Sequence, residues 1–149
     1  GAGLGFQGEF AWQGTRDMSS WLAVPSALQT LQALGPERVA HYNNKLVREA
    51  AQLLVNRWPA HSLPVLGGGC GGECVGMLAV GLPPLAGFTP ADASAAARLH
   101  CWLRSEHKIE VPVTALRGRL FVRLSAQIYN CIQDYRTLLT VLELLAVPA

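Results

Sequence analysis

An arginine stands where an apolar stretch ends, at the start of the segment 123–130, which reads Arg-Leu-Ser-Ala-Gln-Ile-Tyr-Asn. A guanidinium carries a permanent charge and a planar fork of donors, which fits a carboxylate better than any other side chain does. Because an unpaired charge is costly to hold near a core, such an arginine indicates an anion close by. We therefore predict that Arg123 binds the carboxylate of a ligand or, as a surface strand residue, pairs with a nearby acidic side chain.

The four cysteines, at positions 70, 74, 101 and 131, make a weak case for a metal site. Cys70 and Cys74 form one close pair, but structural zinc usually needs a second pair or spaced histidines as well. Cys101 and Cys131 fall on predicted elements, and we expect them to be small, buried hydrophobic residues. No metal ligand is predicted.

A glycine-rich interval over 61–76 invites comparison with a phosphate-binding loop. Such a loop needs a Gly-Lys-Ser/Thr sequence or a helix that begins directly after the glycines. Neither follows here, so we interpret this interval as a flexible loop between elements.

The composition is that of a folded protein of modest charge. Half of the 149 residues are apolar and 15% are charged, which suits one domain with a single core. The net charge of +2 comes from scattered basic residues, a poor footprint for nucleic acid. The apolar runs are far shorter than the ~20 residues that a bilayer needs, and the first residues lack the basic region of a signal peptide. We expect a soluble, cytoplasmic protein with neither a nucleic-acid nor a membrane partner.

The first part of the chain predicts a loop followed by two helices. The stretch 1–13 holds glycines and aromatic residues without a period, and we interpret it as a loop pinned against something larger. Apolar residues at helical spacing over 21–34 predict a helix capped by Asp17 or Ser19. A glycine-proline pair then separates it from a second, long helix over 36–57.

The remainder of the chain predicts short strands and helices. The expected elements are strands at 77–82, 109–113 and 120–125, a turn at 117–119, a helix from a Thr89 cap to about Glu106, and a last helix from about Gln133. The proline in 109–113 places that strand at an edge or ends it there. This order favours an α+β fold, in which a small, mostly antiparallel sheet is covered by helices on one face and preceded by a long connecting helix.

Two regions of the sequence resemble class V aminotransferase-fold enzymes. One contains Gly-Thr-Arg-Asp at 14–17 followed by Leu-Ala-Val-Pro-Ser-Ala-Leu at 22–28. The other contains His-Lys-Ile-Glu-Val-Pro-Val at 107–113 and Val-Arg-Leu-Ser-Ala-Gln-Ile-Tyr-Asn at 122–130. The branch that they resemble most is the isopenicillin N epimerase-like group, which includes cysteine desulfhydrase-like carbon–sulfur lyases.

The resemblance implies a fold-type I pyridoxal phosphate enzyme that acts on an amino acid, with active sites at the interface of a homodimer. In this family a Gly-Thr pair, matched by Gly14 and Thr15, reaches the cofactor phosphate of the neighbouring subunit. A hydroxyl and backbone N–H groups beside a helix start suit an anion, although Thr15 could instead cap the helix. The family's C-terminal arginine binds the substrate α-carboxylate, and Arg123 occupies the matching position.

Three further residues are expected to have structural roles. His107 stands close to two glutamates and is a conceivable general base, but in this family its segment mainly shapes the small domain. Tyr129 and Asn130 are expected to be structural, with Asn130 capping or preceding the last helix and orienting the turn that leads into it.

The lysines depart from the family's pattern. The family's cofactor lysine lies upstream of the Gly-Thr pair, whereas the lysines here, Lys45 and Lys108, lie downstream. We predict no catalytic residue in this chain and no activity of the chain alone. The chain is expected to be the C-terminal portion of an epimerase, carbon–sulfur lyase or aminotransferase. Residues 1–35 would then be a remnant of the large domain, 36–58 a connecting helix and 59–149 the small domain. The alternative is a non-catalytic, truncated homologue that serves as a binding domain.

Overall fold

The computed structural model describes residues 5–10, 14, 17–61, 63–66 and 76–147 of the chain. The chain divides into two compact units, Gly1–Pro36 and Glu37–Ala149. In the described residues the first unit contains two helices, and the second contains a sheet with the remaining helices.

The first unit begins with a short helix where the sequence predicts a loop. Helix α1 spans Gly5–Phe10, and the side chain of Phe6 is 78% exposed. The loop prediction is therefore wrong for these residues. The reason is length, because a helix of fewer than two turns cannot display the repeat of apolar positions on which such a prediction depends.

Helix α2 (Ser19–Leu34) has the bounds that the apolar spacing predicts. At its start the N-cap is Met18, which makes no side-chain capping bond, so the predicted cap at Asp17 or Ser19 is wrong. The backbone N–H of Ser19 donates to Oδ1 of Asp17 at 2.9 Å. At its end, Gly35 takes a φ of 81° and its N–H reaches the carbonyls of Leu31 and Gln32. The helix contains no charged residue and none of its residues is buried.

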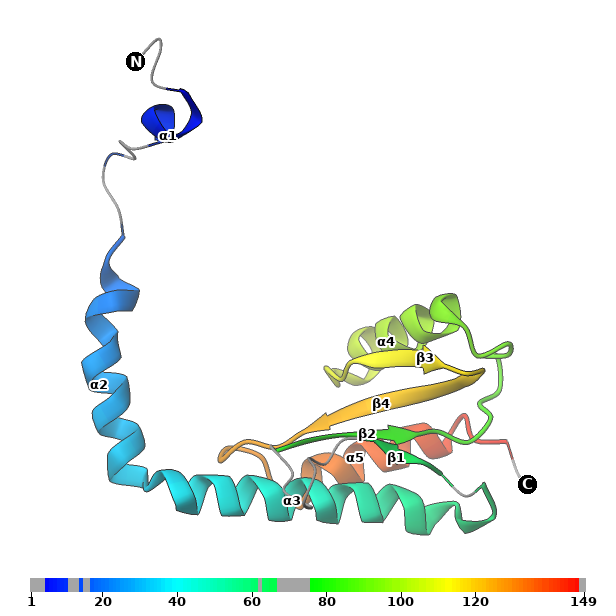
Figure 1. Ribbon diagram of the computed structural model, residues 1–149. Helices are drawn as coiled ribbons and strands as arrows, with labels where there is room; N and C mark the ends of the chain where they lie inside the picture. Colours follow the sequence, from blue (N-terminus) through cyan, green and yellow to red (C-terminus); the bar gives the residue numbers. More distant parts are fainter. Residues whose placement is uncertain (1–4, 11–13, 15–16, 62, 67–75, 148–149) are drawn as a thin grey trace. The chain divides into compact units, whose positions relative to one another are not determined.

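The second unit is built on an antiparallel sheet of four strands in the order β1-β2-β4-β3 (Figure 1). The strands are β1 (Val65–Leu66), β2 (Met77–Gly81), β3 (Val113–Leu116) and β4 (Arg119–Ser125). The helices are α3 (Pro36–Arg57), α4 (Ala93–His107) and α5 (Ile132–Glu143), with a short 3₁₀ turn at Pro59–His61. The predicted α+β fold, with a small antiparallel sheet covered on one face, is confirmed.

The register of the strands assigns every side chain of the sheet to one of two faces. Val80 lies opposite Val122, and Ala79 lies opposite Arg123, and residues opposite each other share a face. One face is buried under the three long helices. The other, which we call the open face because the three long helices of this unit all pack on the opposite side, consists of Leu66, Met77, Ala79, Gly81, Thr114, Leu116, Arg119, Phe121, Arg123 and Ser125. Gly81 and Phe121 are buried on this face, whereas Arg123 is exposed.

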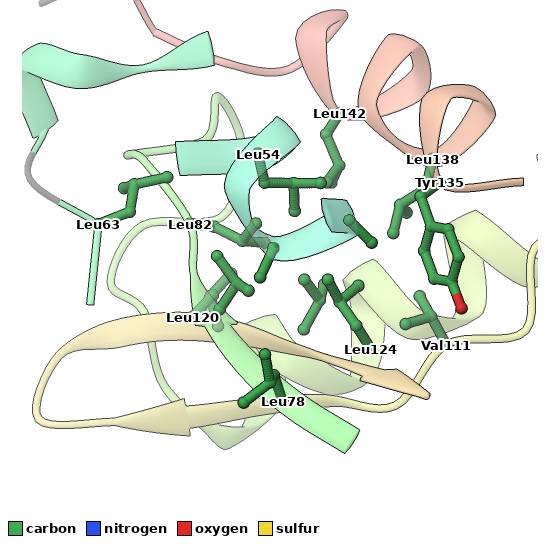
Figure 2. Packing of buried hydrophobic residues seen from close by; sticks show 14 of the residues in the cluster. Leu54, Leu63, Leu78, Leu82, Val111, Leu120, Leu124, Tyr135, Leu138 and Leu142 are labelled. Carbon is green, nitrogen blue, oxygen red and sulfur yellow. The ribbon is translucent and has the colours of Figure 1, made fainter. Parts of the chain in front are cut away.

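The core lies between the sheet and the helices, as Figure 2 shows. Leu54 of α3 is fully buried there with Leu82 and Leu142 (Figure 2). Helix α3 contributes five buried residues, and α4 and α5 contribute four each. The same apolar repeat that predicts these helices therefore also identifies the side that they bury.

The predicted strand at 109–113 is wrong in position, since β3 begins at Val113. Pro112 has no N–H to donate to a ladder, and the N–H of Ile109 is used by the carbonyl of Leu103 at the end of α4. The strand can form only after the proline. The turn at Arg117 and Gly118, both with positive φ, then joins β3 to β4 as predicted.

The cap of α4 is also displaced from the predicted Thr89. Asp92 has an extended backbone, and its Oδ1 accepts a hydrogen bond from the N–H of Ala95 at 2.8 Å. A carboxylate three residues before an N–H that has no helical partner is the better cap. Among the described residues, no helix is long and apolar enough to cross a membrane.

Candidate functional site

Arg123 lies in β4, one of the two central strands, and its side chain belongs to the open face. Ala79 of β2 is directly opposite, and Phe121 and Ser125 flank it along its own strand. Its backbone N–H donates to the carbonyl of Pro112 at 3.0 Å, which fixes the strand on the other side. The guanidinium therefore starts from a regular, fully paired stretch of sheet.

No acidic side chain neutralises Arg123 within the described ranges. None of the four strands contains Asp or Glu. The ion pairs that the described residues form involve other cations: Lys45 with Glu49, Arg57 with Glu143, and His100 and Arg104 with Glu110. The surface-pair interpretation of Arg123 thus finds no partner in this part of the chain.

The loop after β4 is held by its own side chains. Asn130 Oδ1 accepts from the N–H of Gln127 at 3.1 Å, and the N–H of Asn130 donates back to the Gln127 carbonyl at 2.8 Å. Asn130 also donates from Nδ2 to Asp134 in the first turn of α5 at 3.2 Å. Asn130 therefore orients this turn, as expected, whereas Tyr129 does not contribute to its packing and is 82% exposed.

Tyr135 of α5 ties the end of β4 to the core. Its hydroxyl donates to the carbonyl of Ser125 at 2.7 Å, and its ring lies among the buried side chains (Figure 2). Burial, and after it the negative charge of Asp134, raises the pKa of Tyr135 to about 12 from the ordinary 10.0.

This shift predicts a loss of stability at alkaline pH. The unfolded chain releases the Tyr135 proton near pH 10 and the folded chain near pH 12, so stability falls as the pH rises between these values. In Tyr135→Phe this loss should disappear, and the missing hydrogen bond should cost about 1 kcal/mol at neutral pH. Urea unfolding at a series of pH values measures both effects. Tyr129→Phe is the matched control, and equal alkaline losses in all three proteins would contradict the assignment.

The predicted phosphate-contacting pair is only partly described. Gly14 has a φ of 67°, and apart from its chain neighbours no atom of the described residues lies within 4 Å of the position that a Cβ would take. Thr15 lies outside the described residues. Asp17 lies just before the N-cap of α2, Met18, and hydrogen bonds from the side chain and then the backbone of Ser19 lower the pKa of its carboxyl group.

The two lysines do not provide a cofactor attachment site. Lys45 is exposed on α3 and lies 3.9 Å from Glu49. Lys108 ends α4 in a left-handed conformation, and its Nζ donates to the carbonyl of Ser105 at 2.7 Å. Although Lys108 borders an open hollow of about 610 Å³, its ammonium is engaged by the helix end. The described residues alone therefore do not fit a covalently held pyridoxal phosphate.

A charged cluster formed by α4 and Glu110, which follows that helix, was not predicted from the sequence. Glu110 accepts from His100 Nε2 at 2.7 Å and lies 3.3 Å from Arg104 Nε. His107, by contrast, packs its ring edge-on against Trp102 at 4.3 Å, in keeping with a structural role. The spacing of His100 and Arg104, one helical turn apart, is the signal that could have identified this cluster.

The cysteines that the structure describes are both exposed, which corrects their predicted burial. Cys101 lies on the outer side of α4, and Cys131 immediately precedes α5, where the chain turns at the surface. Cys70 and Cys74 lie outside the described residues. Within the described ranges, no three His, Cys, Asp or Glu side chains come close enough together to hold a metal ion.

Comparison with known proteins identifies homologous enzymes. No protein-family model matches the chain. The chain is, however, similar to enzymes named as L-cysteine desulfhydrases and as an isopenicillin N epimerase. This confirms the part of the predicted resemblance that concerns related sequences.

The individual relatives have similar degrees of identity. The probable chloroplastic L-cysteine desulfhydrase of Arabidopsis thaliana is 33% identical over 149 residues, covering 91% of this chain and 29% of the relative. An L-cysteine desulfhydrase of the same plant is 31% identical over 155 residues, covering 91% of this chain and 32% of the relative. The isopenicillin N epimerase of Streptomyces clavuligerus is 30% identical over 138 residues, covering 89% of this chain and 31% of the relative. The chain thus spans about 30% of the length of these relatives.

Proposed function

We propose that this chain is the C-terminal portion of a pyridoxal phosphate-dependent enzyme of the class V aminotransferase fold, which acts on an amino acid. Arg123 would bind the α-carboxylate of the substrate. The observation that carries the proposal is that Arg123 lies on the open face of the sheet and has no acidic partner among the described residues. The chain that contains it is homologous to enzymes named L-cysteine desulfhydrase and isopenicillin N epimerase.

The open face suits Arg123 to this task. Its flanking positions carry small or apolar side chains such as Ala79 and Phe121, which do not compete for the guanidinium. A surface packed over this face would exclude water and so strengthen the attraction between the guanidinium and a carboxylate. The planar fork would then fix the orientation of the bound amino acid through two parallel hydrogen bonds.

The first unit is assigned to the large domain in this proposal, with residues 1–35 as its last part, 36–58 as the connecting helix and 59–149 as the small domain. The absence of charge on α2, together with its exposed Trp21 and Leu22, supports this assignment. A helix with apolar residues on several sides is usually covered by other elements. Gly14 and Thr15 would approach the cofactor phosphate of the second subunit of a homodimer, where backbone N–H groups suit an anion.

The cofactor would supply the electron sink for bond cleavage at the α-carbon, and its lysine would belong to sequence other than this chain. The residues of this chain would bind and orient. They do not transfer protons in this proposal.

The test uses the protein purified from its full reading frame, incubated with pyridoxal phosphate and then with L-cysteine. We expect a visible absorbance band that persists through gel filtration, and release of sulfide on addition of L-cysteine. The chain 1–149 alone, treated in the same way, should show neither. A full reading frame that retains no pyridoxal phosphate would refute the proposed function.

The positions of the two lysines favour a second candidate function, that of a non-catalytic binding domain. Because Lys45 and Lys108 are both engaged at the surface, the described residues contain no attachment site for the cofactor. A non-catalytic homologue that uses the fold to bind a partner would have this property. In that case the full reading frame would contain no lysine upstream of Gly14 whose replacement removes the absorbance band.

A further inference from the structure

Three successive side chains of α3 reach across to the end of the sheet beside Arg123. The hydroxyl of Tyr42 donates to the carbonyl of Asn130 at 2.7 Å. Nδ2 of Asn43 donates to Oε1 of Gln127 at 3.1 Å. Oδ1 of Asn44 accepts from the backbone N–H of Gly76 at 2.9 Å.

The bond from Asn44 closes the last rung of the β2–β4 ladder. The carbonyl of Gly76 accepts from the N–H of Ala126 at 2.8 Å, one position beyond the pair formed by Met77 and Ser125. Gly76 has a φ of 71°, a conformation that favours glycine, and its peptide N–H is directed to Asn44. Asn44 therefore holds this rung from the helix side.

The rung is close to Arg123 along β4. Arg123 is separated from Ser125 by one residue and lies on the same face, so the twist of the strand end sets the direction of its side chain. Tyr42 and Asn43 fix the loop that continues from this end. The described residues provide no side-chain partner on the open face that could orient the guanidinium instead.

Asparagine is a weak helix former, and two in succession inside a helix need a reason. Asn43 and Asn44 both use their side chains for bonds outside α3. Oδ1 of Asn43 is buried without a partner among the described residues, a cost that an apolar residue would avoid. The two asparagines therefore lower the intrinsic stability of α3 at this point, and their side chains connect the helix to the end of the sheet.

We propose that Asn44 is a positioning residue for Arg123, assisted by Tyr42 and Asn43. Asn44 sets the geometry of the β2–β4 end and through it the direction from which Arg123 meets a carboxylate. This inference rests on the proposed function in one respect, because it takes the ligand to be the α-carboxylate of an amino acid.

The first arm of the test concerns the sheet end and uses the chain 1–149. In Asn44→Ala, hydrogen exchange of the Gly76 and Ala126 amides should become about tenfold faster than in the unmodified chain. Asn44→Asp keeps an acceptor at Oδ1 and should restore slow exchange. Asn56→Ala, on the same helix, is the matched control, since the Asn56 side chain accepts a hydrogen bond from Gln52 within α3. Unchanged exchange in Asn44→Ala would overturn the proposal.

The second arm concerns the ligand and uses the full reading frame with pyridoxal phosphate. L-cysteine is compared with cysteamine, which has the same thiol and amine but lacks the carboxylate. Asn44→Ala should lower kcat/KM for L-cysteine about tenfold and leave that for cysteamine unchanged, with Asn44→Asp close to the unmodified enzyme. Tyr42→Phe, which keeps the ring and the fold, should show the same preference to a smaller degree.

The outcomes separate this inference from the proposed function. Equal losses for both substrates would mean that Asn44 only stabilises the fold, and would overturn the positioning role. If Arg123→Ala itself does not discriminate between the two substrates, the carboxylate role of Arg123 fails, and the positioning role fails with it. If Arg123→Ala discriminates and Asn44→Ala does not, only the positioning role is lost.

Discussion

Arg123→Ala is expected to lower kcat/KM for L-cysteine by about 10- to 100-fold in the protein made from its full reading frame. A hydrogen bond to a charged group contributes about 1.5–3 kcal/mol, and each 1.36 kcal/mol corresponds to a factor of ten in rate. Cysteamine, which has no carboxylate, should react at nearly the same rate with and without Arg123. Binding of pyridoxal phosphate should be unaffected, because the guanidinium is proposed to contact the substrate alone. Sulfide release under initial-rate conditions measures the first effects, and cofactor titration measures the last.

Arg123→Lys should retain the positive charge but not the planar pair of donors. Its kcat/KM for L-cysteine should therefore lie between the values of the unmodified protein and of Arg123→Ala. Arg136→Ala is the matched control, because Arg136 is an exposed arginine on α5, which packs against the opposite face of the sheet. A loss of the same size for cysteamine would show that Arg123 supports the fold or the cofactor. Its assignment as a carboxylate-binding residue would then be wrong.

Leu54→Ala is expected to destabilise the second unit by about 3 kcal/mol, within the range of 2–5 found for buried leucines. Leu54 is 0% exposed and lies where α3 meets both the sheet and α5 (Figure 2). Its loss removes apolar contacts and leaves a cavity that helices on two sides cannot easily close. Urea unfolding should show a lower midpoint with an unchanged slope, and the melting temperature should fall by about 10 °C.

Leu144→Ala provides the comparison for this core prediction. Leu144 is 70% exposed at the end of α5, so the same chemical change there should alter stability by less than about 0.5 kcal/mol. If Leu54→Ala is equally mild, α3 is not an integral part of the core of the second unit. A changed slope in the unfolding curve would instead indicate that the unit no longer unfolds in one step.

The long elements could be predicted from the sequence because each carries its own signal. The bounds of α2 and α3 follow from apolar spacing, together with Gly35 and Pro36 at their junction. Strand β4 follows from alternation, and its turn with β3 follows from Gly118. These signals are local, so they persist in the chain whatever surrounds it.

The short elements and the exposure of the cysteines could not be predicted in this way. Strand β1 has two residues and exists only because it pairs with Val80 and Ala79 of β2. A cysteine such as Cys101 is apolar enough to be buried in a core. It is exposed because the opposite side of α4, with Leu99 and Leu103, is the side that is buried. Such outcomes depend on which side of an element meets its neighbours, and a single residue type does not contain that information.

The sequence by itself determined the α+β class, the long helices and strands, and the expectation that Arg123 binds an anion. Only the tertiary structure decided that Arg123 emerges on the open face, that the described part gives it no acidic partner, and that Asn44 holds the sheet end beside it. The physical reason is that charge and periodicity are properties of short segments. The partners of Arg123 and Asn44, by contrast, are set by strand register and by contacts between residues far apart in the chain.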